Sequence, residues 1–125
     1  MNNATVQREV RGRPLTNLEL ATSLGACSTA LGEMLALHFK TFGTLIPHVF
    51  MSRVLDHVRA SVTVDPRPAD IVGILESIET GMESGDRETR TAISISFLSE
   101  AEREPFYVTI LPLLGPRTRA HFTLR

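Results

Sequence analysis

The chain has 125 residues, of which 42% are hydrophobic and 22% charged, and its formal net charge is −1. A chain of this size and composition can bury a hydrophobic core of its own, which excludes wholesale disorder. The near-neutral charge gives no global attraction to nucleic acid or to an anionic membrane, and the single cysteine, Cys27, allows no internal disulfide. We therefore expect one domain that binds neither nucleic acid nor a membrane.

The first fourteen residues are predicted to form a flexible arm. They scatter three arginines and one glutamate without apolar periodicity, and they end in the turn sequence Gly12-Arg13-Pro14. They lack the apolar segment of a secretory signal, and no uncharged run in the chain reaches the ~20 apolar residues of a membrane-spanning helix. The sequence thus predicts an arm over 1–14, a helical domain over 15–125 and a cytoplasmic location.

Two helices are expected at the start of the domain. Thr16 and Glu19 have the capping-box spacing, in which each side chain satisfies the free backbone N–H of the other residue. The helix that begins there should break near Gly25 and resume from Ser28. Gly43 is its predicted C-terminal stop.

The next segment has the clearest helical pattern. Apolar residues recur at every fourth position and form one stripe: Ile46, Phe50, Val54, Val58 and Val62. Pro47 suits a first helical turn, where its missing N–H costs nothing. A helical wheel places four polar residues on the opposite side: His48, Ser52, Asp56 and Arg59.

A further helix is predicted after Asp65-Pro66, which have the types of an N-cap and a first-position proline. Its apolar stripe comprises Ile71, Ile74, Leu75, Ile78 and Met82. Gly85 should end this helix by adopting the left-handed conformation. The segment is expected to pack its stripe on the same core.

The remaining helices are predicted from caps and breakers. Asp86 should cap a helix that runs to about Leu98, and Ser99 with Glu102 repeats the capping-box spacing for the next one. Gly115-Pro116 separates a short C-terminal element. Alternating polar and apolar residues at 61–64, 93–97 and 107–110 would also suit strands, so an α+β fold remains an alternative.

Four short motifs add a resemblance to this pattern. They are Gly43-Thr44-Leu45-Ile46-Pro47-His48-Val49-Phe50, Glu83-Ser84-Gly85-Asp86-Arg87-Glu88, Ser96-Phe97-Leu98 and Leu113-Leu114-Gly115-Pro116-Arg117. Their order and spacing resemble a family of small bacterial helical proteins known only as a domain of unknown function. The resemblance implies an all-α fold, a single compact domain of about five to six antiparallel helices with repeat-like stacking. Such proteins are similar in size and composition to immunity proteins of bacterial toxin systems, a link by analogy alone.

No cofactor or metal site is predicted. No two of the four histidines have the i, i+4 spacing that places two imidazoles on one helical face. His48, Ser52 and Asp56 share a face and have the residue types of a base, a nucleophile and an orienting carboxylate, so a small hydrolase or isomerase is one alternative. A solvated polar face is the simpler interpretation, and His57, within the apolar arc, is expected to be a hydrogen-bonded histidine at the edge of the core.

The charge distribution provides the remaining functional signal. Residues 65–104 contain ten acidic residues against four arginines. Glu76, Glu79 and Glu83 share one helical face, with Val72 beside them, and Asp86 and Glu88 follow across the Gly85 turn.

From this cluster we expect a non-enzymatic interaction module whose acidic surface binds a basic protein partner, such as a toxin that it neutralises. A solvated face without a partner and a homo-oligomeric structural module are the other interpretations of the same pattern.

Overall fold

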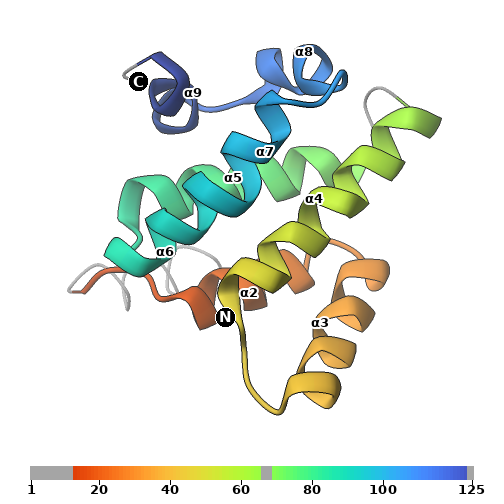
Figure 1. The fold of residues 1–125 in the computed structure, drawn as a ribbon, viewed down its shortest axis with the longest axis vertical. Helices are drawn as coiled ribbons and strands as arrows, with labels where there is room; N and C mark the ends of the chain where they lie inside the picture. Colours follow the sequence, from red (N-terminus) through yellow and green to blue (C-terminus); the bar gives the residue numbers. More distant parts are fainter. Residues whose placement is uncertain (1–12, 66–68, 124–125) are drawn as a thin grey trace.

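The computed structural model describes residues 13–65 and 69–123 (Figure 1). Every regular element in these ranges is helical, and the extended backbone pairs only in one isolated bridge, between Leu15 and Gly85. The all-α prediction is confirmed, and the strand alternative is wrong because 61–64, 93–97 and 107–110 all lie in helical segments. Residues 1–12, most of the predicted arm, lie outside the described residues.

The first two helices follow the local signals in the sequence. α2 (Asn17–Gly25) begins with the complete Thr16–Glu19 capping box. α3 (Thr29–Phe42) begins after Ser28, whose side chain accepts a hydrogen bond from the backbone N–H of Leu31. Gly43 ends α3 with φ at 74°, in the left-handed region that favours glycine. Each of these expectations is confirmed.

The two longest helices supply much of the core. α4 (Pro47–Val64) buries Phe50, Val54, Val58 and Val62, and α5 (Ala69–Ser84) buries Ile71, Ile74, Leu75 and Ile78. Both apolar stripes are therefore confirmed as core except at one end of each, since Ile46, the N-cap of α4, and Met82 are only partly buried. Asp65 follows the last residue of α4 as its C-cap. Because residues 66–68 lie outside the described residues, the predicted capping of α5 by Asp65-Pro66 stays a prediction.

The second half is more fragmented than predicted. Asp86 caps α6 (Arg87–Ile93) as expected, and the chain then continues through a π-helical segment, η1 (Ser94–Leu98), into α7 (Ser99–Glu102). The Ser99–Glu102 capping box is therefore wrong: Ser99 has helical backbone angles, and α7 continues the preceding helical run without a side-chain cap. The continuous run carries Phe97 and Leu98 fully into the core.

Short elements complete the chain. They are α8 (Tyr107–Ile110), the 3₁₀ turn η2 (Leu111–Leu113) and α9 (Pro116–Thr123). The domain thus has more helical elements than the five to six expected, because the predicted fifth helix is divided into pieces.

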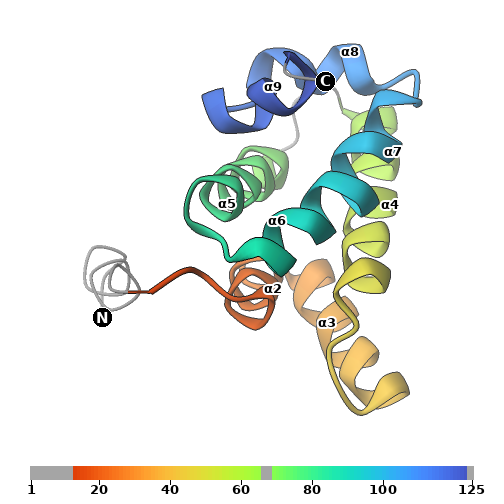
Figure 2. The same ribbon diagram turned by 60° about the vertical axis from the view of Figure 1, so that its left-hand side comes forward.

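The helices pack around a core shared by α2, α4, α5 and α6. Figures 1 and 2 show α4 and the run from α6 to α7 side by side, and α4 contacts both α6 and η1. The two run in the same general direction in both views, so this central pair is not antiparallel. α9 lies over one end of α5, and α3 projects from the opposite end of the domain.

Gly85 has a different role from the one predicted. Among the described residues only Gly43 has a positive φ, so Gly85 does not provide a left-handed cap. A Cβ atom at Gly85 would overlap the carbonyl oxygen of Gly81. The chain also passes Leu15 here, whose N–H donates to the carbonyl of Ser84 at 2.7 Å. Glycine is required at this position by close packing of backbone.

Candidate functional site

The predicted acidic surface keeps three exposed carboxylates. Glu76 and Glu83 lie on α5, and Glu88 lies in the first turn of α6. None of the hydrogen bonds and ion pairs in the described chain involves one of these three carboxylate groups; the Thr80 hydroxyl donates to the backbone carbonyl of Glu76. Val72, 47% exposed, lies on the same face of α5 one turn before Glu76. We call these four residues the acidic stripe.

Glu79 lies on the same helical face but is engaged inside the molecule. Its carboxylate accepts hydrogen bonds from the backbone N–H groups of Arg117 and Thr118, both at 2.9 Å, and from the Thr118 hydroxyl at 2.8 Å. These are the free donors at the start of α9, so Glu79 caps that helix from another part of the chain. Glu79 therefore joins α5 to α9, and its partner-binding role stays a prediction.

The environment of Glu79 is consistent with a carboxylate that stays ionised. Burial raises its pKa, but the two backbone N–H groups, the Thr118 hydroxyl and the charge of Arg117 lower it, and the net shift is downward. A Cβ atom at Gly115 would lie 2.5 Å from the carboxyl carbon of Glu79. The glycine of the Leu-Gly-Pro motif thus makes room for this carboxylate.

Asp86 is also occupied by a structural contact. Its side chain accepts a hydrogen bond from the backbone N–H of Thr89 at 2.8 Å and so caps α6. An N-cap carboxylate is held by the helix it starts, which limits its freedom to follow a partner. The charges that remain available on this side of the chain are Glu76, Glu83 and Glu88.

The alternative polar site is separated by the fold. His48 Nδ1 hydrogen-bonds Ser96 Oγ at 2.7 Å, whereas Asp56 pairs with Arg59 at 2.7 Å. Ser52 is exposed and forms no hydrogen bond with either residue. His48, Ser52 and Asp56 are thus not brought together as a catalytic group. Sequence spacing gave no sign of the His48–Ser96 contact, because it joins residues 48 positions apart.

The His48–Ser96 pair has part of the geometry of a nucleophile and its base. Ser96 is only 7% exposed, within η1, and no carboxylate of the described chain hydrogen-bonds the imidazole. A serine nucleophile needs access to its substrate and an orienting group on the base. The pair instead ties the start of α4 to the π-helical segment.

A second serine, histidine and aspartate set lies at the other end of α4. His57 Nε2 is 2.8 Å from Asp70 Oδ2 and 3.4 Å from Ser61 Oγ. Both partners contact the same ring nitrogen, whereas a catalytic triad uses the two nitrogens for base and orienter. The contact joins α4 to α5, and the expected hydrogen-bonded histidine at the core edge is confirmed.

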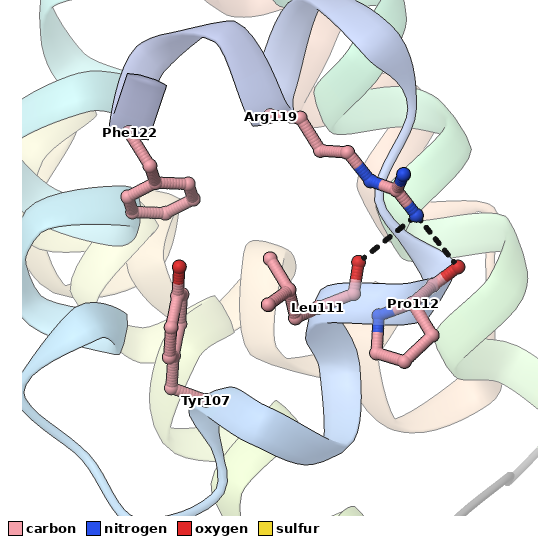
Figure 3. Close-up of a pocket in the computed structure, with 5 residues that line it drawn as sticks. All are labelled: Tyr107, Leu111, Pro112, Arg119 and Phe122. Carbon is pink, nitrogen blue, oxygen red and sulfur yellow. Dashed lines mark hydrogen bonds between the residues drawn. The ribbon is translucent and has the colours of Figure 1, made fainter. Parts of the chain in front are cut away.

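A hollow of about 450 Å³ lies between α8, η2 and α9. It is lined by Tyr107, Leu111, Pro112, Arg119 and Phe122 (Figure 3). The Arg119 guanidinium donates to the backbone carbonyls of Leu111 and Pro112, and the rings of Tyr107 and Phe122 meet edge to face at 5.1 Å. The lining holds no histidine, cysteine or carboxylate, and none of the residues predicted for a site contributes to it.

Two further observations bear on function. Within residues 13–65 and 69–123 no three side chains of the metal-binding types gather, and no helix there is long and apolar enough to cross a membrane. No family model, curated protein or solved structure matches the chain. The fold and the site therefore define a small all-helical domain, and the motif resemblance has no matching family behind it.

Proposed function

We propose that this chain is a non-enzymatic interaction module that binds a basic protein partner through its acidic stripe. The supporting observation is the difference between its carboxylates. Glu79 and Asp86 are engaged with helix termini, whereas Glu76, Glu83 and Glu88 are exposed and have no partner in the described chain. Exposed, uncompensated charge of one sign attracts the opposite charge over a distance of about 10 Å at physiological salt.

Val72 complements these charges. Exposed carboxylates chiefly raise the rate of encounter, whereas affinity comes from apolar contacts that lose their water. Val72 is 47% exposed and one turn from Glu76, so a partner that pairs with Glu76 would also cover it. The partner we propose presents lysines or arginines around an apolar side chain. A toxin that this chain neutralises is one partner of this kind.

The experiment compares two double variants that remove the same charge. Glu76→Gln/Glu83→Gln neutralises the stripe, and Asp56→Asn/Glu100→Gln neutralises two exposed carboxylates on α4 and α7. Figure 2 shows α4 and α7 on the other side of the molecule from α5. Each immobilised chain is exposed to lysate from the native cell, and proteins retained by the wild-type chain are purified and their association rates measured at low and high salt.

We expect the wild-type chain and the control variant to retain one basic protein. The stripe variant should not retain it. Its association rate with the stripe variant should fall at least about threefold at low salt, and the rate should depend less on salt. Equal association with both variants would identify the stripe as a solvated face. Far-UV circular dichroism should be unchanged, because exposed charges contribute little to stability.

A further inference from the structure

The outer face of α3 differs from the surfaces considered so far. Its exposed residues are Thr29, Ala30, Glu33, Ala36, Leu37, Lys40 and Thr41. Leu31 and His38 are buried on the opposite side of the helix, and Leu37 is 63% exposed. An amphipathic surface helix normally shows a charged outer face. Here the outer face has one acid, one base and small or apolar residues between them.

The inner side of α3 is firmly attached to the domain. His38 Nε2 accepts a hydrogen bond from the backbone N–H of Ile46 at 2.9 Å, and its ring meets that of Phe50 edge to face at 5.7 Å. Figures 1 and 2 show α3 projecting at one end of the domain, beside the start of α4. The outer face is therefore presented on a fixed helix and is open to another molecule.

The two charges of this face are arranged so that the helix complements itself. Glu33 and Lys40 are seven residues apart, so they lie on one line along the axis, roughly 10 Å apart at 1.5 Å per residue. Neither has an ion-pair partner in the described chain. If a second α3 lies antiparallel across a two-fold axis between Ala36 and Leu37, Glu33 of each helix faces Lys40 of the other.

We propose that a second copy of this chain docks on α3 in this antiparallel arrangement. The interface is isologous, so one contact made by Glu33 and Lys40 occurs twice. The alanines allow close approach of the helices, and Leu37 packs near the axis against its counterpart. An antiparallel two-fold contact requires opposite charges at equal distances on either side of the axis, which is how Glu33 and Lys40 are placed. This surface is distinct from the acidic stripe, which stays exposed in the pair.

Charge reversal tests the register directly. In Glu33→Lys each helix carries two lysines on this line, and in Lys40→Glu each carries two glutamates, so both variants repel themselves. An equimolar mixture of the two variants pairs lysine with glutamate at both positions. The double variant Glu33→Lys/Lys40→Glu restores the pairs in reverse. Each sample is measured as the full chain by sedimentation equilibrium at low salt.

The wild-type chain should self-associate, and each single variant should do so at least about tenfold more weakly, because two favourable pairs become two repulsions. The mixture and the double variant should recover most of the wild-type association. Glu100→Lys, which makes the same charge change on α7, should leave it unaltered. All of these positions are exposed, so circular dichroism should confirm the same fold.

Three results would overturn the proposal. A wild-type chain that remains monomeric up to millimolar concentration has no such interface. Self-association that survives both single reversals uses another surface. Reversals that weaken association without recovery in the mixture exclude the antiparallel register. Each outcome is independent of the acidic stripe, since none of the samples needs a basic partner.

Discussion

Replacing Glu79 by alanine should destabilise the protein by about 3 kcal/mol, far more than the loss of a surface charge. Glu79 accepts three hydrogen bonds at the start of α9. Loss of an N-cap costs roughly 1 kcal/mol. The hydroxyl of Thr118, a residue only 1% exposed, would also lose its partner, which costs about 1–3 kcal/mol. Urea unfolding followed by circular dichroism measures the sum.

Gly115 provides a second, coupled test of the same contact. In the wild-type chain Gly115→Ala should cost about 1–3 kcal/mol, because its Cβ would lie 2.5 Å from the Glu79 carboxyl carbon. Once Glu79 is alanine, that atom is absent and Gly115→Ala should be nearly neutral. The double-mutant cycle should therefore give a coupling of at least about 1 kcal/mol. Additive effects, or a loss below about 0.5 kcal/mol for Glu79→Ala, would refute the capping role.

The pH dependence follows from the lowered pKa of Glu79. A carboxyl whose pKa is lower in the folded chain than in the unfolded chain stabilises the fold above its unfolded value. This stability is lost as the pH falls from about 4.5 through the folded pKa. Glu79→Gln should therefore show a smaller loss between neutral pH and pH 3 than the wild-type chain does. Equal slopes would contradict the assignment.

Three further predictions concern the core and its edges. Val54→Asp should cost at least about 3 kcal/mol in thermal or urea unfolding, because Val54 is fully buried, whereas Ser52→Asp on the exposed side should change stability little. Burial lowers the pKa of His38, so the imidazole binds a proton more readily in the unfolded chain than in the folded one. The free energy of unfolding should therefore fall as the pH drops below about 6.5, and His38→Gln should make this dependence on pH weaker. A wild-type slope equal to that of the variant would exclude this role for His38. Burial raises the pKa of the Cys27 thiol, so iodoacetamide should alkylate it more slowly at pH 8 in the folded chain than in urea, and equal rates would show an accessible thiolate.

The parts of the fold that depend on neighbours in sequence were predictable. The Thr16–Glu19 box, the Ser28 cap and the left-handed Gly43 each act within one helical turn of the residue concerned. The stripes of α4 and α5 follow from helical periodicity alone. The predicted Ser99 cap was wrong because a capping motif indicates the start of a helix only where the preceding chain is not helical. Here the preceding segment, η1, is already helical.

The candidate site was only partly predictable. Helical spacing correctly placed Val72, Glu76 and Glu83 on an outward face of α5. The same spacing could not show that Glu79 differs from these three residues, because the difference comes from α9, whose first turn binds the Glu79 carboxylate. Gly115 has no side chain with which to cap α9, so the sequence left the free N–H groups of this helix without a local partner but did not indicate which residue would supply one.

The sequence by itself determined which segments become helices, where several of them begin and end, and which face of α4 and α5 is apolar. These properties arise from backbone hydrogen bonding and side-chain periodicity within a few residues. Only the tertiary structure decided the pairings between distant segments: Glu79 with the start of α9, His48 with Ser96, and Asp70 with His57. Such contacts depend on how whole helices cross, since packing of the core fixes the crossing and brings together residues that no local pattern relates.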